Sequence, residues 1–213
     1  MNIFVSDSGN LDRRKWCIDH NVGSLMSPEY GTLSNVAGVV LMVDNGAYGA
    51  WSRGAVWNES AFYRFVDRAA GSLADLVGVV CSDIVCGGLS SLIHSGEHIK
   101  NLSDFPVYLA VQPGIMPSDV VTHLKKYPDY AGLFVGGGDN VSWKWRMLSS
   151  WVDLAHKRNL KCHVGRVGNV RGYMAAAACG VDSVDGSNLM RNDRLGEIER
   201  YRRMQEQQKN LIN

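Results

Sequence analysis

The sequence lacks the patterns that identify membrane, secreted and multidomain proteins. No apolar run reaches the roughly 18 residues of a membrane span, and the N-terminus has no basic segment followed by an apolar one. No linker, repeat or low-complexity tract divides the 213 residues, which suffice for one domain with a sizeable core. We therefore expect a single domain, residues 1–213, in the cytoplasm and without a membrane partner.

Neither sign of charge dominates, and the cysteines form no metal-binding pattern. Lys and Arg number 22 and Asp and Glu 21, so the net charge is +1 and any positive surface for a nucleic acid must be local. An odd number of cysteines without a CxxC pair predicts free thiols in a reducing compartment and no zinc site. The five are Cys17, Cys81, Cys86, Cys162 and Cys179.

Three catalytic motifs are also missing. No lysine ends a strand-like run, because Lys161 begins one, which argues against a Schiff-base aldolase. No HxH pair ends the first run, which argues against an amidohydrolase-type metal site, and GxSxG is absent. The segment GGGDN, residues 136–140, offers backbone N–H groups to a phosphate but lacks the lysine of a P-loop.

What the sequence does contain is a series of short apolar runs, each ending in a small or polar residue. The runs are continuous rather than alternating, as in strands that are buried on both faces. They span residues 3–7, 23–27, 39–44, 77–83, 107–112, 132–138, 161–166 and 182–187.

Amphipathic segments between several of these runs predict helices. Asn58 stands at an N-cap position and Pro117 in a first turn, as helix starts require. The predicted helices span residues 59–73, 117–127, 143–159 and 192–210. In the third, the apolar face that we expect to cover the core consists of Trp143, Met147, Trp151 and Leu154.

Alternation of strands and helices predicts a parallel sheet. Eight candidate strands favour a TIM-type (β/α)8 barrel, a compact one at about 27 residues per unit. A doubly wound open sheet is the alternative.

In such a barrel the ligand site lies where the strands end. A single Asp there is more often a cap for the next loop, but Asp44, Asp83 and Asp185 all follow strand sequence and precede small residues. Two well-placed carboxylates in an apolar mouth suit acid/base or glycosyl chemistry, and we expect the carboxylate of Asp185 to be exposed at its strand end. The strand ends, in order, are Asp7, Ser27, Asp44, Asp83, Gln112, Gly136 with Gly137, Arg166 and Asp185.

Five segments, in order, match the motifs of one family over roughly residues 39 to 191. VDNGAYGAW resembles its D-S-G-G-F/Y-Q motif, YLAVQPG its V-Q-G-G motif and AGLFVGGG its G-x-A-I-G-G turn. VCSDIV stands where the family has a base-reading Asp, and the segment from HVGRVG to SVDGSNLMR resembles its stretch from G-V-G to F-D-C-V-x-P-T-R. The chain thus resembles the tRNA-guanine transglycosylase superfamily, in particular its small phage-type members that place 7-deazaguanines in DNA.

The resemblance implies a role for each matching residue. Asp185 would be the nucleophile and Asp44 the general acid/base. Tyr48 would stack on the base, although a core aromatic under a loop is the plainer interpretation of that residue. Asp83, Gln112 and the Gly136–Gly137 backbone would read the purine edge, Arg191 would contact the nucleic acid, and Arg166 would either face the substrate or be structural.

The implied function is a pentosyltransferase that exchanges guanine in DNA for a 7-deazaguanine such as 7-cyano-7-deazaguanine. Its partners would be DNA and the free 7-deazaguanine base, with no cofactor and no metal, in the host cytoplasm if a phage encodes it. The family's tRNA enzymes carry a C-terminal zinc subdomain with a CxCxxC motif, and no such motif occurs before Asn213. The same exchange on tRNA, or a non-catalytic barrel that binds a purine or a phosphate, are the alternatives.

The C-terminal segment leaves two interpretations open. Its arginines could track phosphates, or they could pair with Glu197, Glu199 and Glu206 along a solvated helix. The arginines are Arg191, Arg194, Arg200, Arg202 and Arg203.

Overall fold

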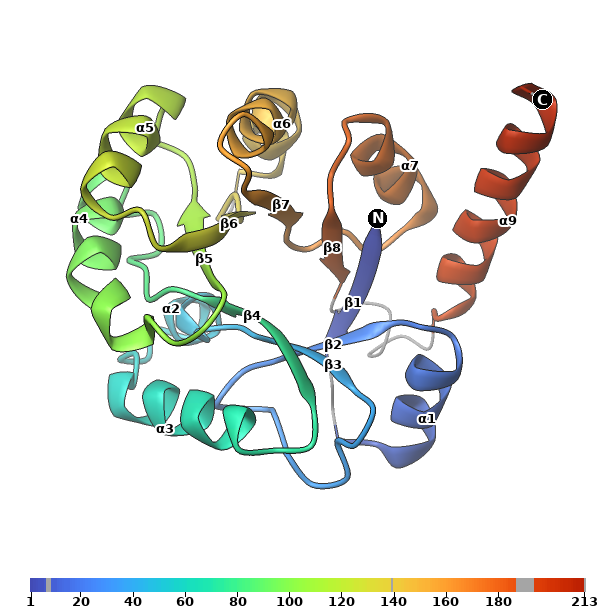
Figure 1. Ribbon diagram of the computed structural model, residues 1–213, viewed down its shortest axis with the longest axis horizontal. Helices are drawn as coiled ribbons and strands as arrows, with labels where there is room; N and C mark the ends of the chain where they lie inside the picture. The colour runs from blue at the N-terminus through green and yellow to red at the C-terminus, as the bar shows by residue number, and fades with distance from the viewer. Residues whose placement is uncertain (7–8, 139, 187–193, 213) are drawn as a thin grey trace.

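The computed structural model is a closed barrel of eight parallel strands surrounded by helices (Figure 1). It describes residues 1–6, 9–138, 140–186 and 194–212. The strands are β1 (Asn2–Ser6), β2 (Gly23–Met26), β3 (Val40–Val43), β4 (Asp75–Val80), β5 (Val107–Val111), β6 (Tyr130–Val135), β7 (Lys161–Val164) and β8 (Ser183–Gly186).

The strands follow one another around the barrel in chain order, and β1 pairs with both β2 and β8. This closure confirms the (β/α)8 prediction and excludes the open sheet. Because all pairs are parallel, the residues that follow the strands gather at one mouth. Each predicted run overlaps a strand, and the polar residue that ends the run generally lies just beyond the last paired position.

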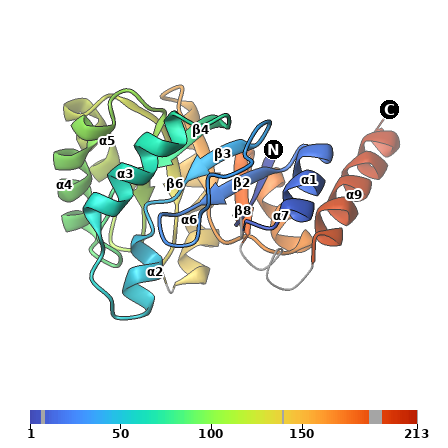
Figure 2. The same ribbon diagram turned by 90° about the horizontal axis from the view of Figure 1, so that it is seen from below.

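The helices occupy connections between strands, except α9, which follows β8. They are α1 (Leu11–Asp19), α2 (Ala47–Ser52), α3 (Glu59–Ala70), α4 (Leu89–His98), the 3-10 helix η1 (Ile99–Leu102), α5 (Pro117–Lys126), α6 (Val141–His156), α7 (Val170–Ala178) and α9 (Gly196–Ile212). Asn58 caps α3 as predicted, because its side chain accepts a hydrogen bond from the Ala61 N–H. The short α2 directly follows the end of β3 and lies below β2 and β3 in Figure 2.

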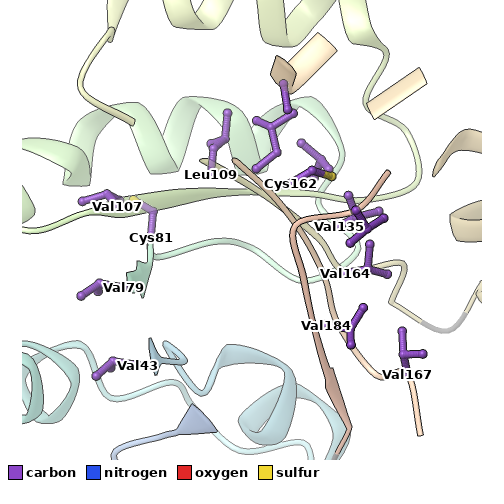
Figure 3. Close-up of a cluster of buried hydrophobic side chains, with 14 of the residues drawn as sticks. Val43, Val79, Cys81, Val107, Leu109, Val135, Cys162, Val164, Val167 and Val184 are labelled. Carbon is purple, nitrogen blue, oxygen red and sulfur yellow. The ribbon is translucent and has the colours of Figure 1, made fainter. Parts of the chain in front are cut away.

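Two apolar clusters hold the barrel. The larger packs strand side chains such as Val43, Val79 and Val135 against the surrounding helices (Figure 3). The smaller fills the barrel with Phe4, Leu25, Met42 and Tyr108. Little free space remains inside the barrel. A Cβ on Gly23 would lie 2.4 Å from the Phe4 ring, and one on Gly132 would lie 2.4 Å from the Tyr108 ring. Glycine at these two positions therefore admits the aromatic rings.

The residues that α6 buries differ in part from those predicted. Trp151 is fully buried, but Trp143, Met147 and Leu154 are only partly so. The helix buries Lys144 instead, which is 1% exposed. Lys144 can be buried because its Nζ contacts two carbonyl oxygens, those of Gly165 and Arg166, in the loop after β7.

The C-terminal helix α9 packs beside α7 and near α1 (Figure 1). Arg202 donates hydrogen bonds to the carbonyl oxygens of His20, at 2.6 Å, and Asn21, at 3.2 Å. Arg194 pairs with Glu197 and Arg203 with Glu199 along the helix itself. These contacts favour the interpretation of α9 as a solvated helix docked on the barrel. Within the described residues, no helix is long and apolar enough to cross a membrane.

Candidate active site

A pocket of about 590 Å³ opens at the carboxyl ends of the strands. Every predicted site residue within the described ranges lines it, whereas Arg191 and the strand-end Asp7 lie outside those ranges. The predicted residues that line the pocket are Asp44, Tyr48, Asp83, Gln112, Gly136, Gly137, Arg166 and Asp185. The sequence thus predicted which residues share this pocket, while their chemical roles remain predictions.

Asp44 follows β3 at a sharp turn. Gly46 adopts a left-handed conformation, with φ of 77°, and donates its N–H to Asp44 Oδ1 at 2.7 Å. Burial, together with the nearby charge of Asp185, raises the pKa of Asp44 from 3.8 to about 6. A carboxyl group with this pKa can both give and take a proton near neutral pH.

Asn45 holds the carboxylate of Asp83 in place. The sequence had suggested no role for Asn45. Its Nδ2 donates to Asp83 Oδ1 at 2.8 Å and to the Cys81 carbonyl at 2.6 Å, so both of its hydrogens are engaged. Its Oδ1 accepts from the Ala47 N–H at 2.8 Å. Burial raises the pKa of Asp83 to about 6, with the Asp44 charge adding to it and the Asn45 hydrogen bond opposing it.

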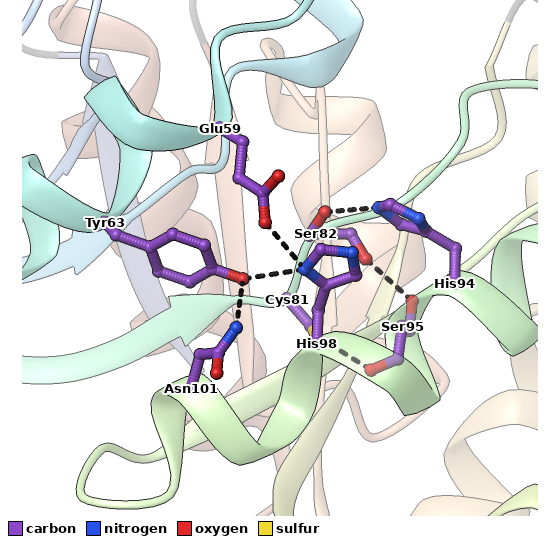
Figure 4. Close-up of polar contacts among 8 residues, drawn as sticks. All are labelled: Glu59, Tyr63, Cys81, Ser82, His94, Ser95, His98 and Asn101. Carbon is purple, nitrogen blue, oxygen red and sulfur yellow. Dashed lines mark hydrogen bonds and ion pairs between the residues drawn. The ribbon is translucent and has the colours of Figure 1, made fainter.

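Behind Asp83, the end of β4 is anchored to α4 (Figure 4). Ser82 Oγ lies 2.6 Å from His94 Nε2, and the Ser95 hydroxyl donates to the Ser82 carbonyl at 2.8 Å. Burial, together with the neighbouring His98, lowers the pKa of His94. Next to it, His98 lies 2.9 Å from the Tyr63 hydroxyl. This network restricts the backbone that carries Asp83 into the pocket.

Asp185 lies within β8 and is 3% exposed, so the expectation of an exposed carboxylate was wrong. Its Oδ1 is 3.0 Å from His163 Nε2, and its Oδ2 accepts the Arg166 N–H at 3.3 Å. His163 is itself fully buried, with its Nδ1 2.8 Å from Ser183 Oγ and its ring stacked on Phe134. Asp185 is buried because its hydrogen-bond partner, His163, lies inside the barrel.

Tyr48 and Arg166 form a stacked pair in the pocket wall. The Arg166 guanidinium carbon lies 4.5 Å from the centre of the Tyr48 ring, and its NH1 donates to the Gly138 carbonyl at 2.9 Å. Tyr48 is partly exposed in the pocket, which excludes the plainer interpretation of a core aromatic. A planar base can therefore stack on the Arg166 guanidinium and extend the stack that this group forms with Tyr48.

Gln112 and Gly136 already use part of their hydrogen-bonding capacity within the protein. Gln112 Oε1 accepts from the Cys86 N–H at 2.6 Å, and its Nε2 donates to the Ile84 carbonyl at 2.7 Å. The Gly136 N–H donates to the Val111 carbonyl at 3.0 Å. Gln112 thus holds the loop that follows Asp83, and one amide hydrogen remains for a ligand.

Among the residues that the structure describes, no group of three His, Cys, Asp or Glu side chains could hold a metal ion. No model of a known protein family matches the chain, and no curated protein sequence matches it.

Proposed function

We propose that this protein is a base-exchange transglycosylase that replaces guanine in DNA with a 7-deazaguanine. The observation that carries the proposal is the pair Asp44 and Asp185, which line one pocket and interact electrostatically. Their environments differ, since Asp185 is held by His163 and Asp44 has a pKa of about 6. Two carboxyl groups in unlike environments are the arrangement that glycosyl transfer through an enzyme ester requires.

In the first step Asp185 attacks C1′ of the target nucleotide. The C1′–N9 bond to guanine breaks, a C1′–O bond to Asp185 forms, and guanine leaves with a proton from Asp44. In the second step 7-deazaguanine gives its N9 proton to Asp44, and N9 attacks C1′ and releases Asp185. Configuration at C1′ is retained because the carbon is attacked twice.

Substrate binding would use the remaining pocket residues. The target must leave the base stack, which takes a few kcal/mol, and the pocket volume of about 590 Å³ has room for a base with its sugar. The base would stack on the Arg166–Tyr48 pair, and Asp83 would accept hydrogen bonds from its edge. The choice of DNA over tRNA rests on the resemblance to the phage-type members of the superfamily.

The test is nucleoside analysis by mass spectrometry after incubation of the protein with 7-cyano-7-deazaguanine and a DNA duplex, with tRNA in parallel. We expect the 2′-deoxynucleoside of 7-cyano-7-deazaguanine in the digested DNA, and we expect chelators to leave the reaction unchanged. Asp185→Asn should abolish it, whereas Asp75→Asn, at the exposed amino end of β4, should not. Tight binding of the free base by wild-type protein without exchange in either polymer would instead identify a purine-binding barrel.

A further inference from the structure

A second, smaller cavity adjoins the main pocket. Its volume is about 150 Å³, and it shares Gly136, Gly138 and Arg166 with the wall of the larger one. It lies where the loops after β6 and β7 and the end of β8 meet the first turn of α6. The lining consists of four glycines and three side chains: Gly136, Gly138, Gly168, Gly186, Val141, Lys144 and Arg166. Glycines leave backbone rather than side chains on most of this wall.

Lys144 is the unexplained residue of this cavity. It is 1% exposed, its Nζ donates to the Gly165 carbonyl at 2.6 Å, and the Arg166 carbonyl lies at 3.4 Å. None of the ion pairs found among the described residues includes it. A buried cation normally has a counter-ion close by, because carbonyl oxygens replace only part of its hydration. Burial lowers the pKa of Lys144 to about 8, and the charge of Asp185, which faces the main pocket and forms no ion pair with the lysine, offsets this only in part.

The charged side chains that line the cavity have one sign. They are Lys144 and Arg166, and none of the described lining residues is acidic. Val141 begins the 16-residue helix α6, whose amino end adds partial positive charge. The segment GGGDN, which the sequence analysis identified as a possible phosphate cradle, contributes two of the glycines.

We propose that this cavity binds a phosphate group. An oxyanion would provide Lys144 with the missing counter-ion and would reach the Arg166 guanidinium, whose fork suits phosphate oxygens. Barrels of this class commonly bind phosphate between the loops that follow their last strands. The cavity adjoins the pocket of Asp44 and Asp185, so the phosphate belongs to the nucleotide whose base occupies that pocket. This last assignment rests on the proposed function, whereas phosphate binding itself does not.

Calorimetric titration with inorganic phosphate at low ionic strength tests the site directly. The wild-type protein should bind phosphate, and Val141→Glu should weaken binding about tenfold or more by placing a carboxylate at the cavity. Val141 is 53% exposed, and an acidic residue in the first turn stabilises a helix, so this variant should fold. Val56→Glu is the matched control, since Val56 is 95% exposed and does not line the cavity.

A second pair of variants tests the lysine. Lys144→Met should abolish phosphate binding, and Lys157→Met, on the exposed residue that ends the same helix, should retain it. If Lys144→Met does not fold, the Val141→Glu result decides. No phosphate binding by the wild-type protein, or equal binding by Val141→Glu and Val56→Glu, would overturn the proposal.

The source of the phosphate is tested with three ligands: deoxyguanosine, its 5′-monophosphate and its 3′-monophosphate. We expect one monophosphate to bind about tenfold tighter than the nucleoside, and Val141→Glu to remove the difference. If a DNA phosphate occupies the cavity, an oligonucleotide with one uncharged methylphosphonate next to the target guanine should bind about tenfold more weakly than the unmodified oligonucleotide. Phosphate binding without any base exchange would refute the proposed function alone, whereas exchange without phosphate binding would refute only this site.

Discussion

His163 Nε2 lies 3.0 Å from Asp185 Oδ1 inside the barrel, with neither side chain open to bulk solvent. An ionised carboxylate can only accept hydrogen bonds, so Nε2 carries the hydrogen and Nδ1 faces the Ser183 hydroxyl. The imidazole therefore orients Asp185 and supports its negative charge. Oδ2, which has only the longer contact to the Arg166 N–H, is the oxygen that is freer to react.

Asp185→Asn should abolish exchange and any covalent adduct with DNA. The amide keeps the shape of the carboxylate, so the fold should persist, as circular dichroism would show. Asp185→Ala should in addition lower the free energy of unfolding by about 1–3 kcal/mol, because His163 loses its buried partner. Residual exchange above a few per cent in Asp185→Asn would exclude Asp185 as the nucleophile.

Asp44→Asn should slow exchange by about 10²–10⁴, the range for a lost general acid/base. DNA binding, measured by fluorescence anisotropy, should remain, because the variant keeps the turn at Gly46. The wild-type rate should change with pH near 6, the pKa of Asp44, and the variant should lose that dependence. A variant that turns over normally but no longer binds DNA would give Asp44 a positioning role instead.

The raised pKa values of Asp44 and Asp83 also predict how stability depends on pH. Both values rise from 3.8 to about 6 on folding, so the native state binds more protons than the unfolded state between these limits. Stability should therefore fall as the pH rises from about 4 to about 6. Asp83→Asn should raise the free energy of unfolding by at most roughly 3 kcal/mol at pH 8 and little at pH 4. Thermal unfolding at both pH values measures this, and a variant less stable than wild type at pH 8 would contradict it.

His163→Phe should reduce exchange although His163 touches no substrate. The phenyl ring can keep the stacking on Phe134, but both hydrogen bonds of the imidazole are lost, and Asp185 keeps only its contact to the Arg166 N–H. A carboxylate that His163 no longer orients should attack more slowly, so kcat should fall while KM stays nearly unchanged. His156→Phe, on the partly exposed partner of Asp182, is the control. An unchanged kcat with only lower stability would reduce His163 to a packing residue.

The strands and the pocket could be predicted because both depend on local sequence. Continuous apolar runs mark the strands, and parallel closure then brings their ends together regardless of the intervening residues. Short helices such as α2 and α7 were not identified as separate elements, since six to nine residues give little periodicity.

The residues that the sequence did not reveal act through long-range contacts. Asn45 meets Asp83 across 38 positions, and His163 meets Asp185 across 22. Lys144 is not part of the apolar face predicted for its helix, because helical periodicity does not reveal which carbonyl oxygens the fold brings near a lysine. The pairing of β3 with β4 brings Asn45 near Asp83, and the register of β7 against β8 brings His163 near Asp185. The path of the loop after β7 places the carbonyl oxygens near Lys144.

The strand that closes the barrel is also the strand that carries Asp185. β8 completes the ring only by pairing with β1, which begins at the second residue of the chain. Pairing of segments so distant in sequence is slow and comes late in folding. A nascent or partly folded chain can therefore display Asp44 and Asp83 long before it has a nucleophile. If Asp185 is the nucleophile that we propose, reactivity towards a glycosidic bond is coupled to completion of the fold, and an incomplete chain cannot attack DNA.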